Sequence, residues 1–152
     1  MAYKGTYRPT NLDKYTGDPS KIVFRSLWER QVMKWCDNNP KVIGWSSEEI
    51  VIPYLCETDK KVHRYFMDFY IKFDSGQELL VEVKPKKQTE PPKKPKQRRT
   101  RRYISESLTY IKNQSKWKAA RQYAAKKGMK FDIWDEDKLK LLGIKIVRET
   151  RK

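Results

Sequence analysis

Apolar and polar residues alternate along two neighbouring stretches in the middle of the chain. Over residues 63–73, and again over residues 79–84, the apolar side chains share one parity. A period of two is typical of strands that bury one face. The connection between them, residues 74–76, ends in Gly76, which suits a three-residue hairpin loop with the glycine in the left-handed position. The pattern therefore predicts an antiparallel hairpin.

Three charged residues of this hairpin, Asp68, Glu82 and Lys84, have the opposite parity and point to the other face. Facing residues in an antiparallel hairpin have a constant index sum, and the two apolar faces must coincide. The three-residue loop gives a sum of 150, which pairs Phe73 with Gln77. The same register sets Asp68 opposite Glu82, so that two carboxylates face each other.

Two facing carboxylates predict a divalent-metal site. Their Cβ atoms would lie about 4.5–5.5 Å apart, so the charges repel unless a cation or a proton lies between them. Hard oxygen ligands at this spacing suit Mg²⁺, which keeps waters for a substrate. Lys84 would lie beside the metal, where its ammonium can orient the attacking water or stabilise charge on a phosphate. An ordinary solvated strand face is the commoner interpretation of a single Asp or Glu, but the joint pattern favours the site.

A helix is predicted from Ser26 to about Asp37, and Glu29 lies in its first turn. Ser26 and Glu29 have the spacing of a capping box, in which the glutamate reaches back to the Ser26 amide. Glu29 also borders the apolar stripe of the helix instead of pointing to open water. From the residues alone, a helix cap and a metal ligand are equally good interpretations of Glu29.

The remaining periodicity predicts one α/β domain over residues 1–152, with a mixed sheet flanked by helices. Its predicted elements are a strand near residues 49–54, helical stretches at 104–111 and 117–124, a strand at 130–134 and a short helix at 137–142. With the first helix and the hairpin, the order is α, β, β, β, α, β, and a right-handed crossover leads to the last strand. Whether residues 113–115 break the long helical region is open. Residues 1–19 predict a polar, loop-like arm, and residues 143–152 a C-terminal tail.

Charge adds a second signal to this picture. Lys and Arg number 35 against 19 Asp and Glu, which gives a net charge of +16 and predicts a polyanionic partner. No basic amphipathic helix with a large apolar face stands out, so DNA is a better match than a membrane surface. The chain also has no apolar run of about 20 residues and no hydrophobic N-terminal segment. We therefore expect a soluble, intracellular protein.

Half of the excess charge lies in a basic, proline-containing loop, residues 85–102, which follows the Glu-x-Lys strand directly. Residues 86–102 hold nine basic residues against Glu90, and their three prolines prevent a continuous helix. We expect an extended or mobile arm that contacts phosphates without reading bases. A solubilising or targeting charge run is the alternative. The residues expected to contact DNA are Lys86, Lys87, Lys93, Lys94, Lys96, Arg98, Arg99, Arg101 and Arg102.

Other polar candidates carry less weight. Cys36 and Cys56 have neither the spacing of a zinc site nor the number of a disulfide framework, so we expect two small residues that are buried or partly buried. His63 is the only histidine; a place near the mouth of the site is one interpretation, and its position as the first strand residue favours a structural role. Lys116 and Arg121 on the later helix would suit phosphate contacts, but nothing in the local pattern raises them above ordinary solvated side chains.

Motifs spread over roughly residues 20–135 occur together in this chain: Phe24-Arg25-Ser26-Leu27-Trp28-Glu29, Asn39-Pro40-Lys41-Val42, Glu49 with Ile52-Pro53-Tyr54, Arg64-Tyr65-Phe66-Met67-Asp68-Phe69, and Glu82-Val83-Lys84-Pro85. Together they resemble the PD-(D/E)xK nuclease superfamily. The similar branch includes the endonuclease subunit of certain cut-and-paste bacterial transposases and the head-completion nucleases of large tailed phages. The small size favours the phage proteins. Met67 stands where the family usually has proline, a position that shapes the strand and does not bind metal.

The resemblance implies a restriction-endonuclease-like core and a metal-dependent DNA endonuclease. It implies metal ligands at Glu29, Asp68 and Glu82, joined by the Val83 carbonyl, and it makes Lys84 the catalytic lysine. For Glu29 it favours the ligand over the cap, with one or two metals left open. The implied cofactor is Mg²⁺, with Mn²⁺ as an acceptable substitute, and the implied products carry 5′-phosphate and 3′-hydroxyl ends.

The biological setting that the resemblance implies is phage head completion after DNA packaging. The expected partners are DNA and phage head or portal components, in the host cytoplasm or associated with the virion, and recognition is expected to follow DNA structure more than sequence. One alternative is the endonuclease subunit of a transposition complex. The other is a catalytically silent protein that binds DNA ends and seals the head, although the intact Asp68, Glu82 and Lys84 speak against it.

Overall fold

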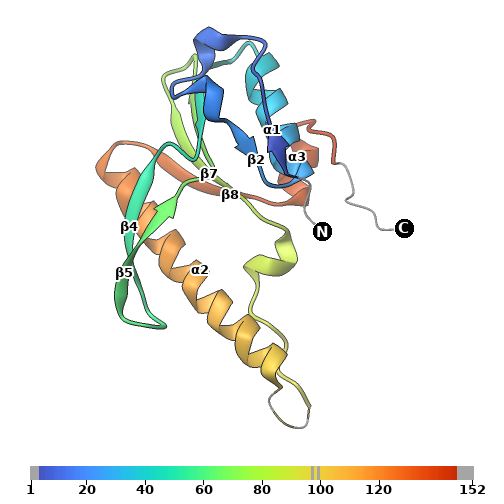
Figure 1. Ribbon diagram of the computed structural model, residues 1–152, viewed down its shortest axis with the longest axis vertical. Coiled ribbons are helices and arrows are strands. Elements are labelled where there is room, and N and C mark those ends of the chain that lie inside the picture. The colour runs from blue at the N-terminus through green and yellow to red at the C-terminus, as the bar shows by residue number, and fades with distance from the viewer. Residues whose placement is uncertain (1–3, 97, 99, 147–152) are drawn as a thin grey trace.

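A four-stranded mixed sheet forms the centre of the domain, as predicted for this fold class (Figure 1). Its strand order is β3–β6–β7–β8, with β3 (Val42–Ser47), β6 (Phe69–Phe73) and β7 (Glu78–Val83) antiparallel and β8 (Lys130–Trp134) parallel to β7. The computed structural model describes residues 4–96, 98 and 100–146. Arg99 and the part of the tail after residue 146 therefore lie outside the described residues.

The predicted hairpin register is confirmed. Phe69 pairs with Val81 and Tyr70 with Leu80, which is the index sum of 150. The loop closes as expected, with the Phe73 amide donating to the Gln77 carbonyl at 2.9 Å and Gly76 at φ +91°. Parity and loop length were sufficient here because both act over a few residues.

The prediction of one long first strand over residues 63–73 is wrong, because the structure divides this stretch into two strands. The chain bends at Asp68, and it leaves one sheet and enters another at Met67 and Asp68, between β5 (Lys61–Phe66) and β6. β5 pairs only with β4 (Val51–Cys56), as a separate two-stranded ribbon. The Met67 amide donates to the Ile50 carbonyl and its own carbonyl accepts from Glu48, so backbone bonds hold the crossing point.

The first strand of the predicted αβββαβ order is also different. The prediction assigned it to residues 49–54, but that stretch is β4 of the ribbon, and β3 takes the place in the central sheet. β3 is buried at five of its six positions, so its sequence lacks the alternation that marks a one-sided strand. β4 alternates clearly because one face packs on the domain and the other faces solvent.

Helices cover both faces of the central sheet, so the expectation of half-buried strands does not hold. Helix α1 (Leu27–Asn38) and helix α3 (Glu136–Leu141) pack on the face that includes Val81, and helix α2 (Arg101–Lys126) packs on the face that includes Leu80. Leu80 and Val81, which are neighbours on β7, are both completely buried. The charged residues of this hairpin therefore lie on a covered face and not on an open one.

The helix boundaries agree with the sequence pattern, and residues 113–115 do not interrupt α2. Ser115 keeps the helical conformation while its hydroxyl donates to the Ile111 carbonyl four residues earlier, at 3.1 Å. The Ser26 hydroxyl caps α1 by accepting from the Glu29 amide. Among the described residues, no helix is long and apolar enough to cross a bilayer.

The N-terminal arm is irregular, as expected, but it is packed on the domain. It contains a two-residue strand, β1 (Gly5–Thr6), paired with β2 (Val23–Phe24), and two short 3₁₀ helices. Tyr7 and Tyr15 are buried and contact Trp45 edge to face. The polar composition of the arm gave no indication that these two tyrosines are buried.

A buried carboxylate at the end of α1 fastens the arm. Asp37 accepts hydrogen bonds from the Tyr7 hydroxyl at 2.7 Å and from the amides of Thr10 and Asn11 at 2.7 and 2.9 Å. Lys14 reaches the backbone carbonyl of the same residue at 3.1 Å. Burial by itself raises the pKa of Asp37, but these hydrogen bonds outweigh it and hold the pKa below its usual value.

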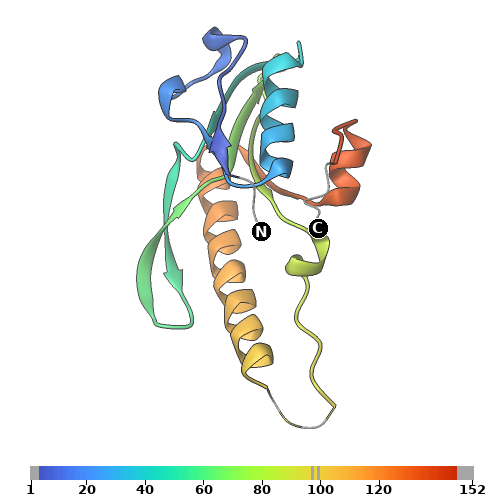
Figure 2. The same ribbon diagram turned by 45° about the vertical axis from the view of Figure 1, so that its right-hand side comes forward.

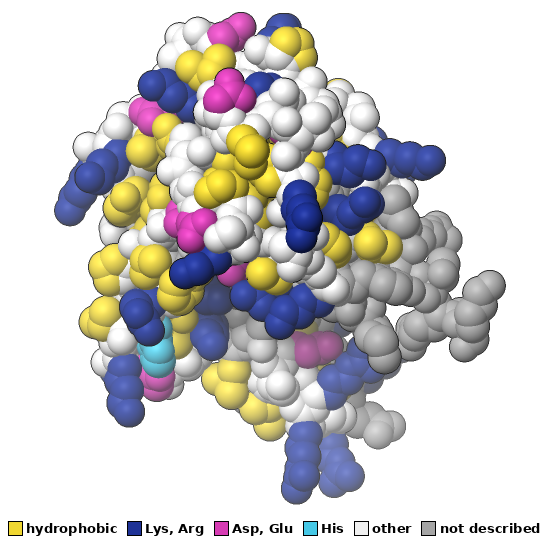
Figure 3. Space-filling model, turned by 45° about the horizontal axis from the view of Figure 1, so that its top comes forward, with side chains coloured by type: hydrophobic (Ala, Val, Ile, Leu, Met, Phe, Trp, Pro, Cys, Tyr) yellow, Lys and Arg dark blue, Asp and Glu magenta, His cyan; other side chains and the backbone are white. Residues whose placement is uncertain are grey.

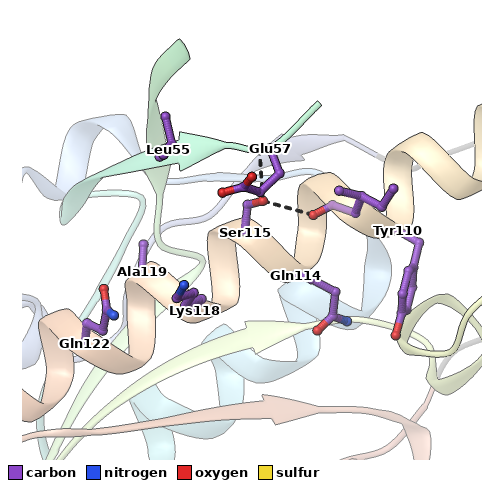
Figure 4. A pocket seen from close by; sticks show the side chains of 9 residues that line it. Leu55, Glu57, Tyr110, Gln114, Ser115, Lys118, Ala119 and Gln122 are labelled. Carbon is purple, nitrogen blue, oxygen red and sulfur yellow. Dashed lines mark hydrogen bonds between the residues drawn. The ribbon is translucent and has the colours of Figure 1, made fainter. Parts of the chain in front are cut away.

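The ribbon and the basic loop extend from the core on either side of α2 (Figure 2). The loop includes a 3₁₀ helix, Lys86–Thr89, and its described residues between this helix and α2 form no further helix or strand. Between β4 and α2 lies a groove of about 490 Å³, lined by Leu55, Ile111 and Ala119 among others (Figure 4). Cys36 and Cys56 are buried, as predicted.

Candidate active site

Asp68 and Glu82 come together where β5 crosses into β6, beside the end of β7. The Asp68 carboxylate accepts a hydrogen bond from the Val83 amide at 2.9 Å. This bond extends the hairpin beyond its last paired residues, so the carboxylate is held at the position that the register predicted. The role of the Val83 carbonyl as a metal ligand stays a prediction, whereas its amide orients Asp68.

Glu82 is almost completely buried, with 6% of its surface exposed. One carboxylate oxygen accepts a hydrogen bond from the Tyr65 hydroxyl, and the other lies 3.4 Å from the Lys84 ammonium. A buried carboxylate is stable only when it is paired or bonded in this way. Lys84 therefore lies next to the Glu82 carboxylate, as the Glu-x-Lys spacing indicates.

Glu29 is turned back toward the strand that precedes its helix. Its carboxylate accepts from the Arg25 amide at 2.9 Å, and not from the Ser26 amide as a simple capping box predicts. Burial raises the pKa of Glu29, and the charges of Glu48 and Glu82 add to the increase. The Glu29 carboxylate thus binds a backbone amide just before α1, and its charge also interacts with that of Glu82.

The three carboxylates fit a divalent cation. Burial, followed by the charges of Glu82 and Glu29, raises the pKa of Asp68 well above its usual value. Three neighbouring carboxylates without enough positive charge are destabilised, and a hard cation with oxygen ligands relieves this repulsion. The side chains of Asp68, Glu82 and Glu29 are therefore the donors that could hold such an ion.

Lys116 of α2 lies next to this site, contrary to the expectation of a solvated side chain. Its ammonium is 5.4 Å from the centre of the Tyr65 ring, and it interacts electrostatically with Glu82 and Lys84. Burial lowers the pKa of Lys116, with the charge of Glu82 acting in the opposite direction. Arg121, by contrast, is exposed and lies over the Phe131 ring.

An ion pair lies at the rim of the site. The Arg25 guanidinium donates two hydrogen bonds to the Glu48 carboxylate, at 2.9 and 3.1 Å. Glu48 has a left-handed backbone, φ 57°, which a non-glycine residue adopts at a cost of about 1–3 kcal/mol. Both residues also interact electrostatically with Glu29. The pair therefore belongs to the surroundings of the site.

Tyr65 was not recognisable from the sequence as a site residue. Its parity places it with the apolar residues, opposite to Asp68 and Glu82, in a single continuous strand. The change of sheet at residues 67–68 removes that constraint, so the Tyr65 hydroxyl reaches Glu82 from the ribbon. No local signal could reveal this contact.

For the metal-dependent DNA cleavage that the resemblance implies, replacing Tyr65 by Phe is expected to reduce the rate by about 10–100-fold, the usual effect of losing a partner that orients a metal-binding carboxylate. The measurement is the Mg²⁺ dependence of the cleavage rate, which should shift to higher concentration. Tyr70→Phe is the matched control, because Tyr70 donates to Glu78 on the same strand β7. Equal losses in both variants would contradict a specific role for Tyr65.

The basic residues of the loop are all exposed where the structure describes them. Lys86 and Lys87 lie in the 3₁₀ helix, and the Lys86 amide donates to Glu136 of α3 at 2.7 Å. The exposed basic residues are Lys86, Lys87, Lys93, Lys94, Lys96, Arg98, Arg101 and Arg102. His63 lies elsewhere, in β5 of the ribbon, bonded to Asp59 at 2.7 Å.

A mixed sheet flanked by helices, with an aspartate at the start of one strand and Glu-x-Lys at the end of the next, defines the PD-(D/E)xK class of nucleases. The chain belongs to the family described as TnsA-like endonuclease N terminal, which matches residues 39–136. It is also 49% identical to the head completion nuclease of Enterobacteria phage T4 over 148 residues, 95% of this chain and 99% of that protein. The predicted resemblance is thus confirmed.

Proposed function

We propose that this protein is a Mg²⁺-dependent DNA endonuclease that acts in phage head completion after DNA packaging. The observation that carries the proposal is the convergence of Asp68, Glu82 and Lys84 at the end of β7. Family membership and the name of the phage T4 relative support the same activity. Mn²⁺ is the expected substitute ion.

Asp68 and Glu82 hold the metal in this proposal, and Glu29 completes the site or recruits a second ion. A bound Mg²⁺ supplies a water of lowered pKa and neutralises charge on the phosphate. Lys84 donates a hydrogen bond to the attacking water or to a phosphate oxygen, and Lys116 adds positive charge from α2. This chemistry needs no histidine base, and it leaves 5′-phosphate and 3′-hydroxyl ends.

DNA approaches through the basic loop, residues 85–102, which leaves the core directly after Lys84. The exposed Lys and Arg residues of the loop are suited to phosphates, and two of them, Lys86 and Arg102, also pair with Asp137 and Glu106. Basic side chains are also widespread over the face in Figure 3, with fewer acidic ones among them. We therefore propose that recognition follows the structure of DNA rather than its sequence.

The direct test is cleavage of labelled duplex, single-stranded, and branched or overhanging DNA in Mg²⁺ or EDTA. Cleavage only in Mg²⁺, and preference for one structure, is the expected result. Binding of every DNA without cleavage would instead favour a silent DNA-end binding protein. A need for a transposase and defined DNA ends would favour a transposition subunit. Binding of the protein to purified DNA-filled phage heads tests the proposed partners.

Replacing Lys93, Lys94 and Lys96 by Gln together is expected to weaken binding of all DNA sequences alike. The logarithm of the binding constant falls with the logarithm of the salt concentration, and each phosphate contact contributes about 0.9 to the steepness of that fall. Loss of three contacts should make the slope shallower by up to about 3. Fluorescence anisotropy across a salt series measures it.

The matched control replaces three exposed lysines away from the loop, Lys21, Lys34 and Lys41, by Gln. The net charge falls by the same amount, but the salt slope should stay near that of the native protein. Equal slopes for the two triple variants would show that the loop acts only through overall charge.

A further inference from the structure

Cys56, Asp59 and His63 form a cluster at the tip of the β4–β5 ribbon, away from the candidate active site. One ligand atom from each side chain lies within 4.8 Å of the other two. Cys56 ends β4, Asp59 lies in the turn and His63 lies in β5. We propose that this tip cluster binds a transition-metal ion, with Zn²⁺ as the ion that it fits best.

The donor types select the metal. A thiolate, an imidazole and a carboxylate are ordinary Zn²⁺ ligands, at about 2.3, 2.0 and 2.0 Å. In a tetrahedral site these bonds place the ligand atoms about 3.3–3.5 Å apart, so shifts of about 1 Å complete the geometry from the present cluster. Mg²⁺ prefers oxygen ligands alone and belongs to the carboxylates around Asp68.

The backbone of the turn already holds the cluster in place. The Lys60 amide donates to the Cys56 carbonyl at 2.8 Å, and Lys60 adopts a left-handed conformation, φ 59°. The Asp59 carboxylate accepts from the Lys61 amide at 3.0 Å. These bonds fix the path of the chain between the first and second ligand, which reduces the entropy lost when an ion binds.

The turn is also anchored to the long helix. The Glu57 amide, directly after Cys56, donates to the Ser115 hydroxyl of α2 at 3.3 Å (Figure 4). Cys56 itself is buried, and its sulfur lies 3.0 Å from the Thr58 hydroxyl. The thiol is thus held beside the turn, and three protein ligands would leave the fourth position of a tetrahedral ion to a water.

The imidazole is oriented from two sides. The His63 ring packs against Tyr54 at 5.8 Å, and its Nε2 is bonded to Asp59 Oδ2 at 2.7 Å. The hydrogen-bonded turn places Asp59 and His63, and core packing places the Cys56 thiol, so that the three ligand atoms lie within 4.8 Å of one another. When the ion binds, the Cys56 proton leaves to solvent and the metal bonds replace the His63–Asp59 hydrogen bond.

A bound ion would connect this tip to the catalytic region through the ribbon. His63 lies two residues before Tyr65 on β5, and the Tyr65 hydroxyl bonds Glu82. An ion that joins the two strands beside their connecting turn would hold this end of the ribbon together. We therefore expect Zn²⁺ to raise the midpoint of thermal unfolding of the native protein, because it binds only the folded state.

The test titrates the full-length protein with Co²⁺, a spectroscopic substitute for Zn²⁺, in excess Mg²⁺. The expected result is one ion per chain, with a thiolate-to-cobalt charge-transfer band and the visible bands of tetrahedral cobalt, all removed by Zn²⁺. His63→Ala should weaken Co²⁺ binding at least 10-fold, since it removes one of three ligands. Absence of the thiolate band in the native protein would overturn the proposal.

Controls separate this site from the other thiol and from the nuclease site. Cys56→Ser should lose the charge-transfer band, whereas Cys36→Ala, which removes the other cysteine, should keep it. Asp68→Asn should also keep the cobalt spectrum, whatever its effect on DNA cleavage. A spectrum that persists in Cys56→Ser or disappears in Asp68→Asn would place the ion elsewhere and refute the tip cluster.

Discussion

Replacing Asp68 by Asn is expected to reduce Mg²⁺-dependent DNA cleavage roughly 1,000-fold or more. The substitution keeps an oxygen that can accept from the Val83 amide, so the local backbone is preserved. It removes a negative charge from the proposed metal site, where the ion is worth several kcal/mol to the transition state, about 1.4 kcal/mol for each factor of ten. Single-turnover cleavage of the preferred DNA substrate measures the loss.

Asp132→Asn is the matched control for this experiment. Asp132 is also a strand aspartate whose carboxylate accepts from a backbone amide, that of Ile133, but it lies on β8. This variant should cut DNA at nearly the native rate. Asp68→Asn should still bind DNA through the basic loop. Native cleavage by Asp68→Asn would contradict its assignment as a ligand.

The same substitution should stabilise the metal-free protein. Burial and the charges of Glu82 and Glu29 raise the pKa of Asp68, so the folded state favours its protonated form. A raised carboxyl pKa costs stability as pH rises above the unfolded value of about 3.9, and each unit of difference is about 1.4 kcal/mol. In EDTA at pH 7, Asp68→Asn should therefore unfold at a higher temperature than the native protein, and Mg²⁺ should narrow this difference by stabilising only the native protein.

Replacing Asp37 by Ala is expected to destabilise the protein by about 3–5 kcal/mol, a large share of the 5–15 kcal/mol typical of a domain. Ala leaves the Tyr7 hydroxyl and the amides of Thr10 and Asn11 without their acceptor. Hydrogen bonds to a charged group are each worth about 1.5–3 kcal/mol, although such values do not add fully. The urea unfolding midpoint measures the change.

Two further variants make the Asp37 experiment specific. Asp37→Asn keeps the shape but not the charge, and it should be affected less than Asp37→Ala. Asp13→Asn changes an exposed aspartate of the same N-terminal arm and should leave the midpoint unchanged. An Asp37→Ala midpoint equal to that of Asp13→Asn would show that the arm is not held by this carboxylate.

Ionisation of Asp37 also makes the free energy of unfolding depend on pH in the acid range. Its folded pKa lies below the unfolded value, so the ionised carboxylate contributes stability above about pH 4. That contribution is lost as pH falls through the folded pKa. The native protein should therefore lose more stability than Asp37→Asn between about pH 5 and pH 2.

Local reasoning was sufficient wherever neighbours along the chain decide the structure. The Gly76 loop and the parity of the flanking strands determine the register, and the Ser26 cap marks the start of α1. Strand β3 escaped prediction because it is buried on both sides and shows no alternation. The break at Met67 and Asp68 escaped because buried and less buried positions continue to alternate across it, although Met67 packs on the α2 side of the sheet and Phe69 on the α1 side.

The sequence by itself determined the α/β class, the antiparallel hairpin, the meeting of Asp68 with Glu82, and a basic segment next to Lys84, because each depends on parity, loop length or composition over a short stretch. Only the tertiary structure brought Tyr65 and Lys116 to Glu82, and the N-terminal arm to Asp37. Those contacts join segments that are far apart in the chain. Their formation depends on how α2, the ribbon and α1 pack together, and no local pattern encodes that packing.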